Sequence, residues 1–209
     1  MVMLGEAHLK LGKASAVGKE VVAAFELRGV ETFQVRKVLA GHLLWLFIHV
    51  PRLLLRLASF GLVKDSTIVD ARNTPAGNTL ALEKADRMPL GLHAASLYLT
   101  VLFAVLFSQI AVSALGLYVP ALTAVAVAFE AHFLLLVPAT LLRRWKWCWL
   151  VHPAMGLVTT RDRLMADGTV RMLREHPEPP YALVIMGRAH LPGFEQELVV
   201  RYGFRRVER

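Results

Sequence analysis

Apolar and polar positions divide the chain into two arms of short elements around a long apolar middle. Short apolar runs at Met1–Leu4 and Ala182–Met186 each end close to a glycine, which predicts two buried strands. Apolar residues at helical spacing predict helices over Ala16–Leu27, Thr159–Arg174 and Phe194–Arg201. Strands that alternate with helices predict an α/β fold, with a small mixed or parallel sheet and flanking helices built from both arms.

The same pattern also predicts where several of these helices and strands begin and end. Gly29 and Gly203 are expected to end the first and the last of these helices. Val30 and Glu31 begin a further short segment that runs to Arg36, and Phe204–Val207 is expected to be an edge strand.

The apolar middle predicts a transmembrane hairpin. Leu90–Tyr118 and Ala121–Leu142 are each long enough to cross a hydrocarbon core of about 30 Å at about 1.5 Å per residue. Between residues 90 and 142 the only charged residue is Glu130, and the only turn is Gly116–Pro120. A single short turn returns the chain to the side from which it entered, so both arms are expected on one side of the membrane.

Residues 39–63 predict a separate apolar helix that carries Pro51. Its polar residues fall within an arc of about 80° at about 100° per residue, and they are His42, His49, Arg52 and Arg56. We expect the helix to lie in the membrane interface, with its arginines reaching the headgroups. A short spanning helix is the alternative, although two arginines near its centre would be costly.

Composition and charge support a membrane protein. Of the 209 residues, 56% are hydrophobic, the formal net charge is +8 and the mean hydropathy is +0.48. The basic residues lie in the two arms, and none of them forms a phosphate-tracking run with interleaved aromatics, so a lipid bilayer rather than nucleic acid is the expected partner. Basic residues that flank the hairpin place both termini in the cytoplasm of an inner-membrane protein. Cys148 is the only cysteine, which excludes an internal disulfide framework.

The expected organisation has five segments. Residues 1–38 and 143–209 form the two halves of the α/β domain, 39–63 the interfacial helix, 64–89 a polar connector and 90–142 the hairpin. A tryptophan belt at Trp145, Trp147 and Trp149 is expected at the cytoplasmic face.

One motif occurs in both arms. Gly5-x-x-His8 and Gly187-x-x-His190 each follow a predicted strand, and ligands gather at the carboxyl ends of strands in open α/β sheets. Two histidines and a carboxylate such as Glu31 would suit a divalent transition metal that acidifies a water molecule for attack on a carbonyl. Glu6 is less favoured as a ligand because strand geometry turns it to the other face. The alternative is that both glycines are simple turn residues after strands.

Other ionisable residues have open interpretations. Arg161 begins the predicted helix before the last strand, where it would bind a carboxylate or phosphate, or else face headgroups and water. Glu130 and His132 lie inside the second predicted span, where ionisable residues are functional candidates. A contact between hairpins in a homo-oligomer explains them equally well.

Four motifs in the same order resemble the TraB/PrgY/GumN family, which includes the Tiki proteases. They are VMLGEAHL at the amino end, Val30–Arg36, the segment Arg161–Ala166, and MGRAHLPGFEQELVVRYGFRRV near the carboxyl end. The resemblance implies a site of His8, Glu31, Arg36, Arg161 and His190, and a metal-dependent peptide cleavage like that of Tiki proteins. PrgY relatives are tied to shutdown of a peptide pheromone, and most bacterial members have no established activity. The chain departs from the family in its middle, where the expected interfacial helix and hairpin replace part of the usual domain.

The sequence therefore leaves three hypotheses. The first is a membrane-anchored, metal-dependent hydrolase or peptidase at the cytoplasmic face, with catalytic Glu31, Arg36 and Arg161 and with His8, His190 and Glu31 as metal ligands. The second is a non-enzymatic membrane protein whose cleft binds a peptide or a protein partner. The third is a small transport subunit built from oligomerised hairpins.

Overall fold

The computed structural model describes residues 1–6, 9–11, 21–32, 34–65, 78–178 and 180–207. The chain forms two compact units. Unit 1 comprises Met1–Phe33, Arg52–Ala85 and Arg161–Arg209, and unit 2 comprises Gln34–Pro51 and Asp86–Thr160.

Unit 1 is built on a four-stranded parallel sheet, as the α/β pattern predicts. Its strands are β1 (Val2–Glu6), β3 (Leu27–Val30), β5 (Asn78–Ala81) and β6 (Ala182–Gly187), in the order β1-β6-β3-β5. The two strands that carry the Gly-x-x-His motifs pair directly, with Glu6 opposite Gly187. The two arms of the chain therefore meet in the middle of one sheet. A separate antiparallel pair joins β2 (Leu9–Leu11) to β4 (Val63–Asp65).

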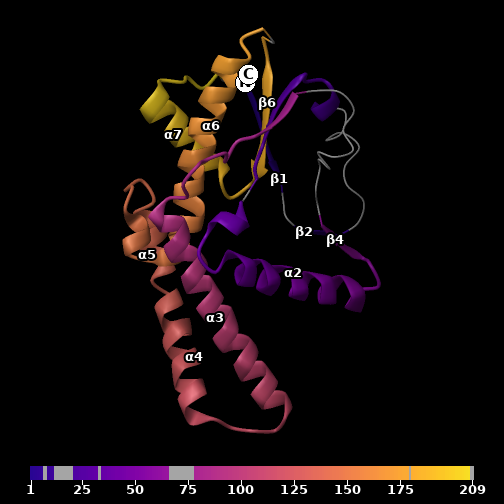
Figure 1. Cartoon of the computed structure of the whole chain (residues 1–209), viewed down its shortest axis with the longest axis vertical. Helices are drawn as coiled ribbons and strands as arrows, with labels where there is room; N and C mark the ends of the chain where they lie inside the picture. The colour runs from indigo at the N-terminus through magenta and orange to yellow at the C-terminus, as the bar shows by residue number, and fades with distance from the viewer. Residues whose placement is uncertain (7–8, 12–20, 33, 66–77, 179, 208–209) are drawn as a thin grey trace. The chain divides into compact units, whose positions relative to one another are not determined.

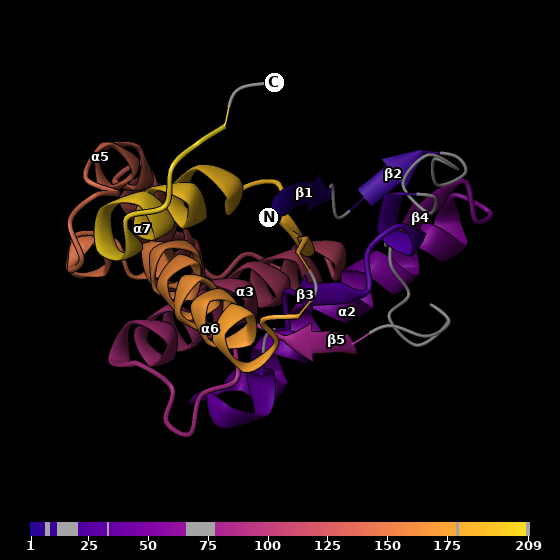
Figure 2. The ribbon, with the colours of Figure 1, turned by 90° about the horizontal axis from the view of Figure 1, so that it is seen from above.

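Two helices cover one face of this sheet. Figure 2 shows α6 (Arg161–Glu175) and α7 (Leu191–Tyr202) together on the same side of the strands. Val184 and Met186 of β6 join the core under these helices, whereas Leu183 and Ile185 join a smaller cluster on the opposite face. All six residues of β6 are buried, so its continuous apolar run is the signature of a strand covered on both faces.

Three expectations for unit 1 differ from the structure. Leu27 and Gly29 belong to β3 rather than to the end of a helix, because Leu27 is fully buried and the side chains of Leu82 and Met172 fill the space of a Cβ at Gly29. The segment Phe204–Val207 contains no strand. The polar segment 64–89 is more than a connector, since it supplies β5 and the buried Leu82.

Unit 2 is helical in its described part. It contains α3 (Leu90–Ala114), α4 (Pro120–Phe133) and α5 (Leu136–Leu141), and short turns follow at Cys148–Leu150, Pro153–Met155 and Gly156–Thr160. Figure 1 shows α3 and α4 side by side and joined at one end. A Cβ at Gly156 would overlap the carbonyl oxygen of Gly91, so these two glycines allow the backbone after Met155 to approach the start of α3.

Three helices are long and apolar enough to cross a membrane, judged over the described residues by length and composition. They are α2 (Gly41–Ala58), α3, and the stretch Pro120–Leu141 that contains α4 and α5. Very little of the first and third is buried in the protein, and of the residues of α2 only Gly41 and Leu44 are buried.

Candidate functional site

Polar side chains gather at the carboxyl ends of three neighbouring strands of unit 1. Glu31 directly follows β3, Glu83 lies two residues after β5, and His190 lies three residues after β6. The Glu31 N–H donates to the carbonyl of Ile185 at 2.9 Å, so the ladder between the strands continues up to the site. This is the edge of a parallel sheet at which α/β proteins bind ligands.

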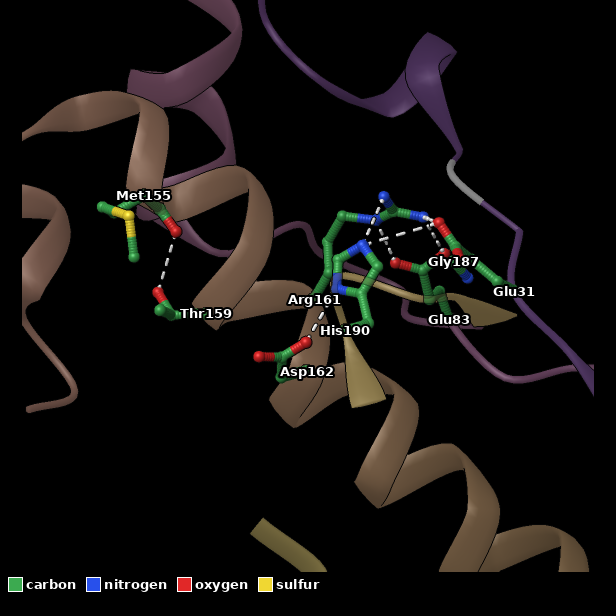
Figure 3. Close-up of polar contacts among 8 residues, drawn as sticks. All are labelled: Glu31, Glu83, Met155, Thr159, Arg161, Asp162, Gly187 and His190. Atoms are coloured by element: carbon green, nitrogen blue, oxygen red, sulfur yellow. Dashed lines mark hydrogen bonds and ion pairs between the residues drawn. The ribbon is translucent and has the colours of Figure 1, made fainter. Parts of the chain in front are cut away.

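The guanidinium of Arg161 lies at the centre of this polar cluster, at the first residue of α6 (Figure 3). Its Nε donates to Glu83 Oε1 at 2.6 Å, and its Nη2 donates to Glu83 Oε2 at 3.0 Å. Nη2 also forms an ion pair with Glu31. Nη1 lies 3.2 Å from Nε2 of His190. One cation thus contacts two carboxylates and an imidazole that come from three strand ends.

The contacts of His190 define its tautomer. Arg161 has only donors, so the contact at Nε2 requires that nitrogen to be an acceptor. Nδ1 then carries the proton and donates it to Asp162 Oδ1, 2.7 Å away. Asp162 is the residue after Arg161, and both side chains are buried. A neutral imidazole oriented by a carboxylate is the arrangement of a general base.

Burial and charge shift the two glutamates in opposite directions. Burial alone would raise the pKa of Glu31, but three contributions outweigh it and lower this pKa: the charge of Arg161, the charge of His190 in its protonated form, and the Gly187 N–H, which donates to Glu31 Oε2 at 2.5 Å. Glu83 is only 2% exposed, and its burial raises its pKa despite the hydrogen bonds from Arg161. Carboxyl groups whose pKa values are pushed apart in one site are suited to acid and base roles.

Close backbone packing holds the cluster in place. A Cβ at Gly168 of α6 would overlap the carbonyl oxygen of Leu82, so α6 crosses the chain directly beside Glu83. Arg171 Nη2, from the same helix, donates to the carbonyl of Lys84, the residue after Glu83, at 3.0 Å. At the neighbouring motif, a Cβ at Gly5 would meet the side chain of Leu191 at 2.5 Å. Gly5 of β1 therefore lies in close contact with Leu191, the first residue of α7.

The structure brings together three of the residues chosen from the sequence: Glu31, Arg161 and His190. His8 lies outside the described residues. Arg36 belongs to unit 2, in a 3-10 turn at Val35–Lys37, and its side chain is exposed. Sequence reasoning missed Glu83 and did not give Asp162 a role. The only local signal for Glu83 is weak: it follows the three-residue apolar run Leu80–Leu82, much as Glu31 follows β3.

Of the three predicted metal ligands, the structure describes Glu31 and His190, and both of them face a guanidinium. No three His, Cys, Asp or Glu side chains among the described residues are grouped so that they would hold an ion. The reason is visible in the donor set: Glu31 Oε1 and His190 Nε2 both face the guanidinium of Arg161, and these two atoms are 3.6 Å apart. A positive charge therefore already lies where the two predicted ligands converge, and it opposes the binding of a divalent cation there.

Unit 2 has a polar cluster of its own. His132 Nδ1 lies 2.9 Å from the hydroxyl of Tyr98, and the rings of His132 and His152 stack with centroids 4.9 Å apart. His152 is fully buried, and burial together with His132 lowers its pKa. Glu130 is exposed on α4. Cys148 is buried, and its thiol donates to the hydroxyl of Thr159.

Comparison with family models, with curated proteins and with solved structures finds no match for this chain. The resemblance to the TraB/PrgY/GumN family therefore remains a prediction from its four motifs.

Proposed function

We propose that the chain is a membrane-anchored hydrolase whose site is the Glu31–Glu83–Arg161–Asp162–His190 cluster of unit 1. The observation that carries this proposal is the orientation of His190. Its Nδ1 is held by Asp162, so the lone pair of Nε2 faces the other polar groups of the site. The resemblance to TraB-like proteins supports a peptide or another amide as substrate.

In this reaction His190 takes a proton from water while the water oxygen attacks the substrate carbonyl. The water replaces Nη1 of Arg161 as the hydrogen-bond donor to Nε2. A small rotation of the guanidinium moves Nη1 from Nε2 towards the substrate, while Glu83 remains its partner at Nε and Nη2. The guanidinium then stabilises the negative charge that develops on the carbonyl oxygen. The proton then passes from His190 to the leaving amine, and the products are a carboxylate and an amine.

The helices of unit 2 support the membrane anchor. In the proposed arrangement α3 and the Pro120–Leu141 stretch cross the bilayer as a hairpin, and both termini and the site lie on the cytoplasmic side of the membrane. The length and composition of these helices support this, as do the basic residues that flank them in the sequence.

The test is turnover by the full chain purified in detergent. Internally quenched peptides of randomised sequence, together with aryl amides and aryl esters, form the substrate panel. Wild type is expected to cleave at least one class, and His190→Ala is expected to lose about 10²-fold or more of that rate. His176→Ala is the matched control, because His176 lies beyond the carboxyl end of α6 and outside the cluster.

Two results would overturn the proposal. One is the absence of turnover across the whole panel, which would favour the non-enzymatic binding protein. The other is a cleavage rate that His190→Ala leaves unchanged.

A further inference from the structure

The cluster around Arg161 has the outline of a metal centre with a guanidinium in place of the ion. Three groups of the kind that ligate zinc converge on the guanidinium: the carboxylates of Glu31 and Glu83 and Nε2 of His190. Three protein ligands of this kind are the usual set of a catalytic zinc site. Glu31 directly follows β3, whereas Glu83 and His190 lie in the turns after β5 and β6, so three neighbouring strands bring the groups to one edge of the sheet.

The groups that hold these three side chains in place also resemble those of a metal site. A histidine that binds a metal through one ring nitrogen usually donates a hydrogen bond from its other ring nitrogen, often to a carboxylate. Asp162 accepts such a hydrogen bond from Nδ1 of His190 at 2.7 Å, and the Gly187 N–H holds the second oxygen of Glu31. In a metal site, groups of this kind orient the metal ligands. In this protein they orient the side chains that contact Arg161.

The charges explain why a guanidinium is stable in this place. Arg161 is 7% exposed and Glu83 is 2% exposed, and a buried cation of this kind needs close anionic partners. The two glutamates supply them and, against the effect of burial, raise the pKa of Arg161. A guanidinium does not lose its proton in proteins, so the site holds a permanent positive charge that needs no added ion.

We propose that Arg161 is the resident cation of this site, so that the wild-type cluster excludes divalent metal and Arg161→Ala converts Glu31, Glu83 and His190 into a metal-binding site. This inference rests on the proposed function for the role of the cluster, but its test reads metal binding and not turnover. Removal of the guanidinium leaves two carboxylates and an imidazole without their shared cation. For zinc to bind, the glutamate side chains must close the space that the guanidinium occupied, until their oxygens reach the distances of about 2.0–2.2 Å that the ion requires.

The experiment is a titration of detergent-purified full chain with Co²⁺, followed by visible absorption and by metal content after gel filtration. Wild type is expected to show no d–d absorption and no stoichiometric metal. Arg161→Ala is expected to bind one Co²⁺ per chain, and excess Zn²⁺ is expected to raise its melting temperature by on the order of 5 °C. The matched control is Arg163→Ala, which removes an arginine of the same helix that pairs with Glu197 and is expected to gain no metal.

Two further variants keep the inference open to refutation. Arg161→Ala with His190→Ala is expected to lose the Co²⁺ spectrum, which assigns the bound ion to this cluster. Arg161→Lys retains a cation and is expected to fold and to stay free of metal.

If the wild type binds stoichiometric metal and His190→Ala loses that metal, the inference is overturned, whether or not Arg161→Ala folds. A folded Arg161→Ala that binds no Co²⁺ would overturn it as well. Because wild-type turnover is measured separately, a metal-free inactive protein contradicts the proposed function alone, and an active protein that requires metal contradicts this inference alone.

Discussion

The carboxylate of Asp162 lies 2.7 Å from Nδ1 of His190, although 28 residues separate them in the chain. Asp162 is in the first turn of α6, and His190 is the residue before α7. The packing of these two helices on one face of the sheet therefore creates a buried His–Asp pair beside Arg161. The orientation of His190 depends on this pair, and so does the proposed reaction.

Asp162→Asn is expected to lower the rate of hydrolysis by about 10²–10⁴-fold, because the neutral amide no longer stabilises the imidazolium that forms during proton transfer. The measurement is kcat/KM on a substrate from the peptide panel. Asp167→Asn on the exposed side of the same helix is the control and is expected to keep the wild-type rate. An unchanged rate in Asp162→Asn would show that His190 does not depend on this carboxylate.

The lowered pKa of Glu31 predicts an acid-sensitive contribution to stability. The unfolded chain holds this proton at its ordinary pKa of 4.5, whereas the folded chain binds it more weakly. The free energy of unfolding therefore contains a Glu31 contribution that is present above pH 4.5 and is lost as pH falls through the folded-state pKa. Urea unfolding of wild type and Glu31→Gln is expected to give a stability difference that shrinks below this pH. A difference that stays constant or grows on acidification would contradict the assignment.

Glu83 should show the opposite dependence. Its pKa is raised by burial, so the folded chain holds the proton more tightly than the unfolded chain does. The contribution of Glu83 to stability then falls as pH rises from about 4.5 towards its folded-state pKa. Glu83→Gln, which does not titrate, is expected to lose less stability than wild type between about pH 4.5 and pH 7. Parallel curves for the two proteins would contradict the raised pKa.

Gly168→Ala tests the packing that positions Glu83. The added methyl group would overlap the carbonyl oxygen of Leu82, and a backbone atom cannot turn away as a flexible side chain does. We expect a loss of about 3 kcal/mol in the free energy of unfolding, at the upper end for overpacking. Arg174→Ala, at an exposed position near the end of the same helix, is expected to change stability by less than about 0.5 kcal/mol. Equal stabilities of the two variants would show that the approach of α6 to Leu82 is not tight.

Val101→Lys tests the proposed membrane span. Val101 lies near the middle of α3 and is 40% exposed, so a lysine fits there without steric conflict. A lysine at the centre of a spanning helix opposes insertion by about 2.5–3.5 kcal/mol. The membrane-integrated fraction after carbonate extraction is expected to fall, whereas Val101→Leu is expected to remain integrated. Full integration of Val101→Lys, or release of the wild type by carbonate, would contradict a span at α3.

The sequence predicted the parts of unit 1 that depend on local patterns. The apolar runs of β1 and β6 and the amphipathic α6 are confirmed close to their expected limits, and so is the Gly203 cap of α7, which has a φ of 71°. The α/β class followed from their alternation. Glu31, Arg161 and His190 were found because each adjoins such an element.

What the sequence did not predict depends on contacts between distant segments. β5 is only four residues long and lies in a polar stretch, so its pairing with β3 has no strong local signal, and Glu83 was missed with it. Gly29 is typical of a helix end, yet Leu82 and Met172 make it part of a tightly packed strand. The contact of Arg161 with Glu83 spans 78 residues, and no local pattern reveals that a guanidinium lies where the predicted metal ligands converge.

The central claim is that His190 activates water for hydrolysis at the carboxyl end of the parallel sheet. Its most direct test is the rate of peptide cleavage by detergent-purified wild type and His190→Ala, each with the folding checked by circular dichroism. We expect measurable cleavage by wild type, unchanged in His176→Ala and reduced about 10²-fold or more in His190→Ala. Equal rates in wild type and folded His190→Ala would contradict the claim.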